Sequence, residues 1–215
     1  MKFHNFLFAP LLGFVLTFST SSYAATISDL LITEIMANPS AALDRDGEWF
    51  ELFNPTSNAI DLNGIELHDA HNDSLTLSSV TNLIINSGDY FVFARNAVTA
   101  INGGFTADYS YGSDFLLTNS SDEIIFSDSS GELLRLDYGS GFVANGASME
   151  LTSNNMLLSN YSASTQIYGN GDLGTPGSVG SYAFTTTPSP VPLPGTAWLL
   201  LSGLIGLVSF RRKNT

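Results

Sequence analysis

The segment from residue 30 to residue 55, LLITEIMANPSAALDRDGEWFELFNP, constrains the fold more than any other part of the chain. It contains two short apolar runs rich in β-branched and aromatic residues, and an Asn-Pro pair follows each run. Such short runs predict β-strands, because a helix would need a longer apolar stripe that repeats about every 3.6 residues. Asn-Pro pairs favour turns, so the two strands are predicted to be joined by the small, acidic loop 41–47.

The same pattern continues to about residue 182. Short apolar runs alternate with Asn, Gly, Ser and Asp, and helical periodicity is nearly absent. This pattern predicts an all-β domain, a sandwich or a barrel. A turn at 128–131 is expected to join neighbouring strands as a hairpin, and Trp49 is expected to fill the core. The predicted strands are 30–36, 48–54, 61–68, 74–77, 83–85, 90–94, 123–127, 133–138 and 147–151.

Composition excludes several classes of protein. The 215 residues include no Cys, so disulfides, thiolate metal sites and a Cys nucleophile are ruled out. Between residues 25 and 190, three arginines face 20 acidic residues, which leaves a formal charge of 3 − 20 = −17. Such a surface repels nucleic acid and anionic membranes, so neither is expected as a partner of this region. Cations, or a need for solubility, fit it better.

The two ends of the chain are apolar. Residues 1–24 have the form of a secretory signal helix, with Lys2 before the apolar run 6–18 and a cleavage site after Ala24; a retained anchor is the alternative. Residues 185–194, TTTPSPVPLP, are predicted to form an extended linker. Residues 195–210 are predicted as a transmembrane helix of about 24 Å, and the basic residues that follow should keep its end cytoplasmic.

Two groups of polar residues suggest metal sites. Asp44, Asp46 and Glu48 alternate beside a glycine, and carboxylate oxygens of this kind suit Ca²⁺. A solvated acidic hairpin tip is the competing interpretation. His68 and His71 are spaced as H-x-x-H near aspartates, which suits a divalent metal or, equally, a polar turn. G-x-S-x-G, P-loop and dinucleotide motifs are all absent, so no catalytic residue is assigned.

The central region resembles the lamin tail domain family from about residue 29 to 182. The resemblance implies an immunoglobulin-like β-sandwich, placed here at residues 25–184, and a role in interaction rather than catalysis. Two departures are Ile65, where the family often has Trp, and the missing Asn after the final G-T-P-G. The matching residues are Ile32, Thr33, Glu34, Ile35, Asn38, Pro39, Glu48, Trp49, Glu51, Leu52 and Asn54, with the segments 60–67, 83–94, 116–124 and 174–178.

The C-terminal region 191–215 resembles the bacterial PEP-CTERM sorting signal in its V-P-L-P form. A Pro-rich motif, a short apolar helix and a basic end follow one another. The resemblance implies processing by an exosortase-type transpeptidase and delivery to the cell surface or extracellular matrix; an ordinary C-terminal anchor is the alternative. The residues that carry it are Val191, Pro192, Leu193, Pro194, Trp198, Leu199, Arg211 and Arg212.

Together these features predict an exported, noncatalytic binding module, anchored in the membrane at least transiently. Its expected partner is a surface polysaccharide or another surface protein, and it needs no cofactor unless Ca²⁺ binds. One alternative is a secreted metal-dependent hydrolase, although 150-odd residues leave no room for a separate catalytic domain. The other is a structural matrix protein that Ca²⁺ crosslinks.

Overall fold

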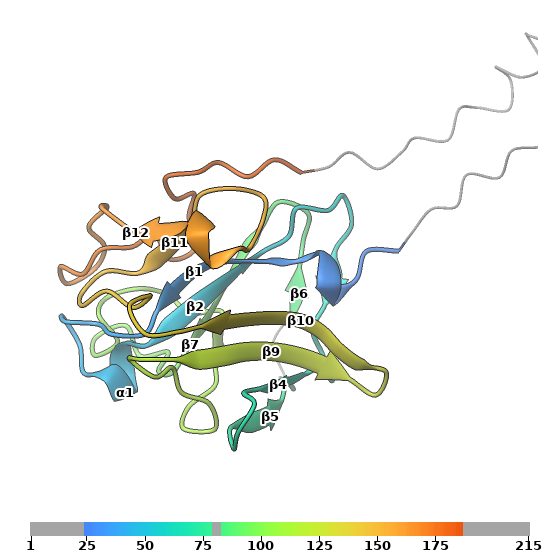
Figure 1. Ribbon diagram of the computed structural model, residues 1–215, viewed down its shortest axis with the longest axis horizontal. Helices are drawn as coiled ribbons and strands as arrows, with labels where there is room; N and C mark the ends of the chain where they lie inside the picture. Colours follow the sequence, from blue (N-terminus) through green and yellow to red (C-terminus); the bar gives the residue numbers. More distant parts are fainter. Residues whose placement is uncertain (1–23, 79–82, 187–215) are drawn as a thin grey trace, which may run out of the picture. The chain divides into compact units, whose positions relative to one another are not determined.

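A computed structural model describes residues 24–78 and 83–186 (Figure 1). The predicted signal segment up to residue 23, most of the Pro-rich linker and the sorting tail lie outside the described residues. In the described part, no helix is long and apolar enough to cross a membrane. The elements are η1 (Ile27–Asp29), β1 (Leu31–Met36), α1 (Asp44–Gly47), β2 (Trp49–Phe53), β3 (Ile60–Asp61), β4 (Glu66–His68), β5 (Ser74–Thr76), β6 (Ile84–Ile85), β7 (Tyr90–Ala94), β8 (Tyr109–Ser110), β9 (Asp122–Asp128), β10 (Gly131–Tyr138), β11 (Met149–Leu151), η2 (Leu158–Asn160) and β12 (Tyr161–Ala163).

The strands form two main sheets and a small ladder. One sheet has the order β12-β11-β1-β2-β7-β8 and is antiparallel except between β7 and β8. The other has the order β10-β9-β4-β5, and β3 pairs with β6 separately. The main core joins side chains of both sheets, such as Phe50 and Phe93 from the first and Phe126 from the second. The predicted all-β, immunoglobulin-like sandwich is confirmed.

Aromatic side chains fill the space between the sheets. The ring of Phe50 stacks on that of Phe93, with centroids 4.8 Å apart and planes 5° apart. Phe126 meets both rings edge-on, and Phe115 meets Phe50 in the same way. Edge-to-face and offset contacts of this kind are the favoured geometries for aromatic rings, so they stabilise the two sheets against each other.

Turn chemistry decides where the strand predictions succeed and fail. The hairpin at 128–131 is confirmed: Asp128 pairs with Gly131, whose φ of +125° favours glycine. The predicted strand 61–68 is wrong, because a turn divides it into β3 and β4. Asp61 accepts a hydrogen bond from the backbone N–H of Asn63 (2.9 Å), and Gly64 has a φ of +81°.

The central strands β1, β2 and β7 of the six-stranded sheet are buried on both faces. Because successive side chains of a strand point to opposite faces, Phe50 enters the main core while Trp49 points away from it. Trp49 is fully buried, as predicted, but in a second cluster with Met36, Val92 and Phe105. This second face, rather than the space between the sheets, carries the site described next.

Candidate functional site: a groove over the second face of the sheet

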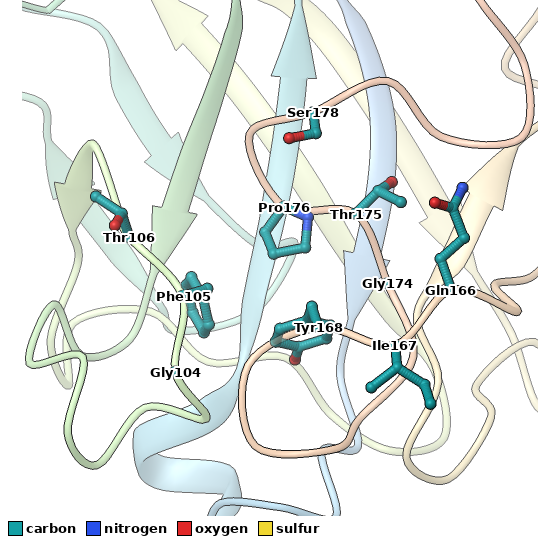
Figure 2. A pocket seen from close by; sticks show the side chains of 10 residues that line it. All are labelled: Gly104, Phe105, Thr106, Gln166, Ile167, Tyr168, Gly174, Thr175, Pro176 and Ser178. Carbon is teal, nitrogen blue, oxygen red and sulfur yellow. The ribbon is translucent and has the colours of Figure 1, made fainter.

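A groove of about 340 Å³ lies over the outer face of the six-stranded sheet (Figure 2). Two loops and the segment after residue 173 form its walls. The lining residues are Gly104, Phe105, Thr106, Gln166, Ile167, Tyr168, Gly174, Thr175, Pro176 and Ser178. We refer to it as the 104–178 groove.

The two loops touch through their backbones at glycines. The N–H of Asn170 donates to the carbonyl of Gly103 (2.8 Å). A Cβ added at Gly169 would lie 2.1 Å from that carbonyl oxygen, and one at Gly104 would lie 2.9 Å from the Cα of Gly169. Both glycines also have positive φ, so the close approach of the loops requires glycine at each position.

Asn102 holds the first loop in shape from inside. Its side chain is fully buried, and its amide nitrogen donates to the carbonyls of Asn96 (3.0 Å) and Phe105 (3.1 Å). Its amide oxygen accepts from the backbone N–H groups of Gly104 and Phe105. Since one side chain satisfies four backbone groups, this wall of the groove is fixed before any ligand arrives.

Two of the lining residues, Phe105 and Tyr168, pack on the buried ring of Trp49. The indole Nε1 of Trp49 donates to the hydroxyl of Tyr168 (3.0 Å), and the two rings meet edge-on with centroids 5.8 Å apart. Phe105 contacts both rings, with centroids 5.6 and 5.9 Å away. Burial raises the pKa of the Tyr168 phenol well above its usual range, so the hydroxyl is neutral at physiological pH.

Three glutamates on neighbouring strands lie beneath the wall that the segment after residue 173 forms. We call them the glutamate ladder. Glu34 of β1 pairs directly with Glu51 of β2 on one side and with Glu150 of β11 on the other. Their side chains are 1%, 1% and 4% exposed. Residues 174–182, the strap, cover the ladder and continue into the groove wall, and their amides and hydroxyls hydrogen-bond to it.

Burial dominates the protonation of Glu34 and Glu51 in the ladder. Desolvation raises the pKa of Glu34 to about 7, against the opposing hydrogen bonds from Ser148 and Thr175. Burial, and next the charge of Glu34, raise the pKa of Glu51 well above its usual range. Charged carboxylates are costly in such a place, so protons are retained there far above the pH at which an exposed glutamate loses its proton.

The model of the Lamin Tail Domain family matches residues 23–141. The chain belongs to the lamin tail domain family. No curated protein matches the chain. The match ends before β11, yet β11 is paired with β1 inside the six-stranded sheet. The lamin tail domain of this chain is therefore completed by residues 142–186, which also supply β12, the strap and seven of the ten groove-lining residues.

The acidic loop of the lamin tail domain does not bring Asp44, Asp46 and Glu48 together. The first two lie in the one-turn helix α1, where they accept hydrogen bonds from the amides of Asn119 (2.9 Å) and Asn96 (3.0 Å). Glu48 is buried and bound to Arg95 (2.9 Å). Within 24–78 and 83–186, no three acidic or His side chains are grouped to hold a metal ion, so the expected Ca²⁺ group is not formed.

The two histidines serve the polar turn that was the alternative to a metal site. The Nδ1 atom of His68 lies 2.7 Å from the carbonyl oxygen of Asp69. The carboxylate of Asp69 accepts from the backbone N–H groups of His71 and Asp73 (2.8 and 2.9 Å), which closes the turn after β4. The exposed His71 ring lies 3.6 Å from the Glu123 carboxylate.

Sequence reasoning missed the groove and the ladder. The groove combines residues 104–106 with residues 60 to 74 positions later (166 − 106 = 60, 178 − 104 = 74), in loops that have no periodic pattern. The ladder did leave a signal, since Glu34 and Glu51 each stand inside a predicted strand among apolar neighbours. An acidic residue in such a strand marks a face that is either open to solvent or covered by another segment.

Proposed function

We propose that this lamin tail domain protein is an exported, noncatalytic module that binds uncharged carbohydrate in the 104–178 groove. The observation that carries the proposal is the contrast between the groove and the rest of the domain. The ten lining residues include no charged side chain, although the domain bears a formal charge of −17.

The charge of the domain argues against anionic ligands. Each of the three arginines in the described residues is already paired: Arg45 with Asp46 (3.4 Å), Arg95 with Glu48 (2.9 Å) and Arg135 with Asp137 (2.6 Å). An anionic polysaccharide, phosphate or nucleic acid would therefore meet uncompensated carboxylates. A neutral sugar chain meets no such repulsion.

The groove offers the groups that sugars use. Thr106, Gln166 and Ser178 are exposed and carry hydroxyl or amide groups that donate and accept hydrogen bonds, as sugar hydroxyls do. Tyr168, Pro176 and Ile167 provide the apolar surface that the C–H faces of a sugar ring can cover. The groove thus combines apolar surface with polar groups that can fix the orientation of a ligand.

The groove also lacks the parts of a hydrolytic site. Its one titratable lining side chain is Tyr168, whose hydroxyl already accepts the Trp49 hydrogen bond. General acid–base catalysis needs a group that exchanges protons near the working pH, and this phenol does not. These features support binding without chemistry and weigh against a secreted metal-dependent hydrolase.

Export and sorting form the second part of the proposal. The signal-like residues 1–24, with cleavage after Ala24, would deliver the domain through the membrane, and the tail 191–215 would hold it there for an exosortase-type enzyme. Mass spectrometry of the mature protein tests this directly. We expect an N-terminus at Ala25 and loss of the residues after the Val191–Pro194 motif; a product that retains both ends would contradict it.

The binding claim is tested on residues 24–189, which form one compact unit with its own core. Affinity electrophoresis and calorimetry against a panel of neutral and anionic polysaccharides should show retention by neutral chains only. Gln166→Ala should weaken that retention about tenfold, which corresponds to one lost hydrogen-bonding side chain of ~1.4 kcal/mol. Thr165→Ala, an exposed neighbour outside the groove, is the matched control. Retention by no neutral polysaccharide would remove the proposal.

The acidic surface also favours a second candidate, a structural matrix protein that Ca²⁺ crosslinks between copies. All 20 acidic residues lie in the domain, and its three arginines are paired. Light scattering by the mature protein should rise on addition of millimolar Ca²⁺ and reverse with a chelator if this role is real. Unchanged scattering would remove it without affecting carbohydrate binding.

A further inference from the structure

Among residues 24–78 and 83–186, the glutamate ladder has no cationic partner. The ionisable groups that face it from neighbouring elements are Asp108, Tyr90 of β7, Tyr168 and Tyr182, all acidic or phenolic. The strap itself, GTPGSVGSY, contains no charged residue. In the described residues, the three arginines are paired with other acids and the two histidines lie at the turn after β4. Like charges on directly opposed strand positions destabilise a sheet.

The strap is fixed to the sheet through these carboxyl groups. Each of the three accepts a hydrogen bond from a backbone N–H of the strap. The bonds are Thr175 to Glu34 (2.8 Å), Gly177 to Glu51 (2.7 Å) and Ser181 to Glu150 (3.0 Å). Two glycines let the strap lie this close. A Cβ at Gly174 would lie 2.9 Å from an oxygen of Glu34, and one at Gly180 would lie 3.2 Å from an oxygen of Glu150.

The second oxygen of each carboxyl group faces a hydroxyl. Thr175 Oγ1 lies 2.8 Å from Glu34, Thr33 Oγ1 lies 2.7 Å from Glu51, and Ser164 Oγ is bonded to Glu150. A hydroxyl can donate or accept, whereas a backbone N–H can only donate. A protonated carboxyl group therefore fits each position, with its carbonyl oxygen toward the strap amide and its O–H toward the hydroxyl.

We propose that the ladder is a proton-dependent clasp: protons retained by Glu34 and Glu51 hold the strap on the sheet, and their loss releases it. Once Glu34 and Glu51 are both ionised, their mutual repulsion acts in a place where none of the described residues supplies a counter-charge. Release of the strap exposes the carboxylates to water and removes that repulsion. The strap also supplies Gly174, Thr175, Pro176 and Ser178 to the groove, so release dismantles one groove wall.

The direction of the pH response follows from the burial of the ladder. The folded state raises the pKa of Glu34 to about 7 and raises that of Glu51 well above its ordinary value of 4.5. The folded, strapped state thus binds protons that the released state gives up. The clasp is fully closed below about pH 4.5 and weakens as the pH rises through about 7. Carbohydrate binding should weaken over the same pH range. Only this last consequence rests on the proposed carbohydrate function.

Amide hydrogen exchange measured by NMR on residues 24–189 tests the clasp without any ligand. Protection factors, corrected for the intrinsic rate at each pH, are compared at pH 5.5 and pH 8.5. We expect the amides of Thr175, Gly177 and Ser181 to lose at least tenfold in protection, while Ile125 and Phe126 of β9 keep theirs. Unchanged protection in the strap would overturn the proposal.

A substitution identifies the groups responsible. Glu51→Gln keeps an oxygen for the Gly177 amide and an NH₂ group for the Thr33 hydroxyl, and it removes one ionisable group from the ladder. In this variant the loss of strap protection at pH 8.5 should fall to less than threefold. Glu132→Gln, which removes an exposed glutamate of β10, should behave as the wild type. An undiminished loss in Glu51→Gln would overturn the proposal, because another group would then control the strap.

If Glu51→Gln does not fold, ¹³C titration of the glutamate carboxyl carbons in the wild type decides. Normal titration of Glu34 and Glu51 near pH 4.5 would overturn the clasp. The proposed carbohydrate function fails separately: a clasp that opens in a protein that binds no sugar leaves this inference standing. If the strap opens but sugar binding is equal at pH 5.5 and pH 8.5, the clasp stands. Only the claim that strap release weakens binding in the groove would then be removed.

Discussion

Gly174→Ala is the substitution whose cost follows most directly from the geometry. A Cβ at this position would lie 2.9 Å from Glu34 Oε1, 3.0 Å from Ser148 Oγ and 3.0 Å from Trp49 Cζ2. All three neighbours are essentially fully buried, so none can move aside into solvent. Gly174 does not have a positive φ, and the effect is therefore steric and not a matter of backbone conformation.

Overpacking of this kind costs about 1–3 kcal/mol. For a domain of this size that corresponds to a loss of about 2–12 °C in Tm, at about 2–4 °C for each kcal/mol. Far-UV circular dichroism during urea and thermal unfolding of residues 24–189 measures both quantities. We expect the loss of stability in Gly174→Ala to lie at the upper end of both ranges, because two of the three clashes involve polar atoms that are already hydrogen-bonded.

Gly139→Ala is the matched control. It too lacks a positive φ, and an added Cβ would meet nothing within 4 Å. We expect its free energy of unfolding to change by less than ~0.5 kcal/mol, or to rise slightly because alanine has fewer unfolded conformations. If the two variants differ by less than about 0.5 kcal/mol, the strap does not pack on the ladder as described.

Three further perturbations probe other parts of the domain. Arg95→Gln should cost on the order of 3 kcal/mol, because it leaves the nearly buried Glu48 without its ion-pair partner; Arg135→Gln, which breaks exposed pairs, should cost less than ~1 kcal/mol in the same denaturation assay. Trp49→Phe keeps an aromatic ring but loses the hydrogen bond to Tyr168, so it should cost at least ~1 kcal/mol, and an unchanged stability would show that this bond contributes nothing. Truncation after residue 141, where the family match ends, removes β11 and the strap; we expect no cooperative unfolding transition, whereas a two-state transition equal to that of residues 24–189 would contradict the assignment of residues 142–186 to the domain.

The sequence predicts the parts of the fold whose chemistry is local. Asp128-Ser129-Ser130-Gly131 contains everything that a tight turn needs, so the β9–β10 hairpin follows from it. The turn at Asn63-Gly64, which divides 61–68 into two strands, is equally local in its chemistry. The apolar residues on either side of it favoured one continuous strand in the prediction. The two-residue strand β8 has no such signal, because its pairing with β7 decides its conformation.

The candidate site depends on contacts that no local pattern contains. Glu34 is covered by Thr175, 141 positions later in the chain, and the acidic character of its strand reveals neither the cover nor the partner. The three residues predicted to bind Ca²⁺ are not grouped in the described residues, for a related reason. Glu48 was taken with its sequence neighbours Asp44 and Asp46, whereas the fold directs it to Arg95, 47 positions away.

The central claim is that an uncharged ligand is held where the strap meets the two loops. ¹H–¹⁵N chemical-shift mapping of residues 24–189 at pH 5.5, during titration with the neutral polysaccharide fragments retained in the binding screen, locates the contact directly. We predict saturable shifts confined to residues 104–106, 166–168 and 174–178. Shifts centred elsewhere, for example on α1 or the β9–β10 hairpin, would contradict the assignment of the site.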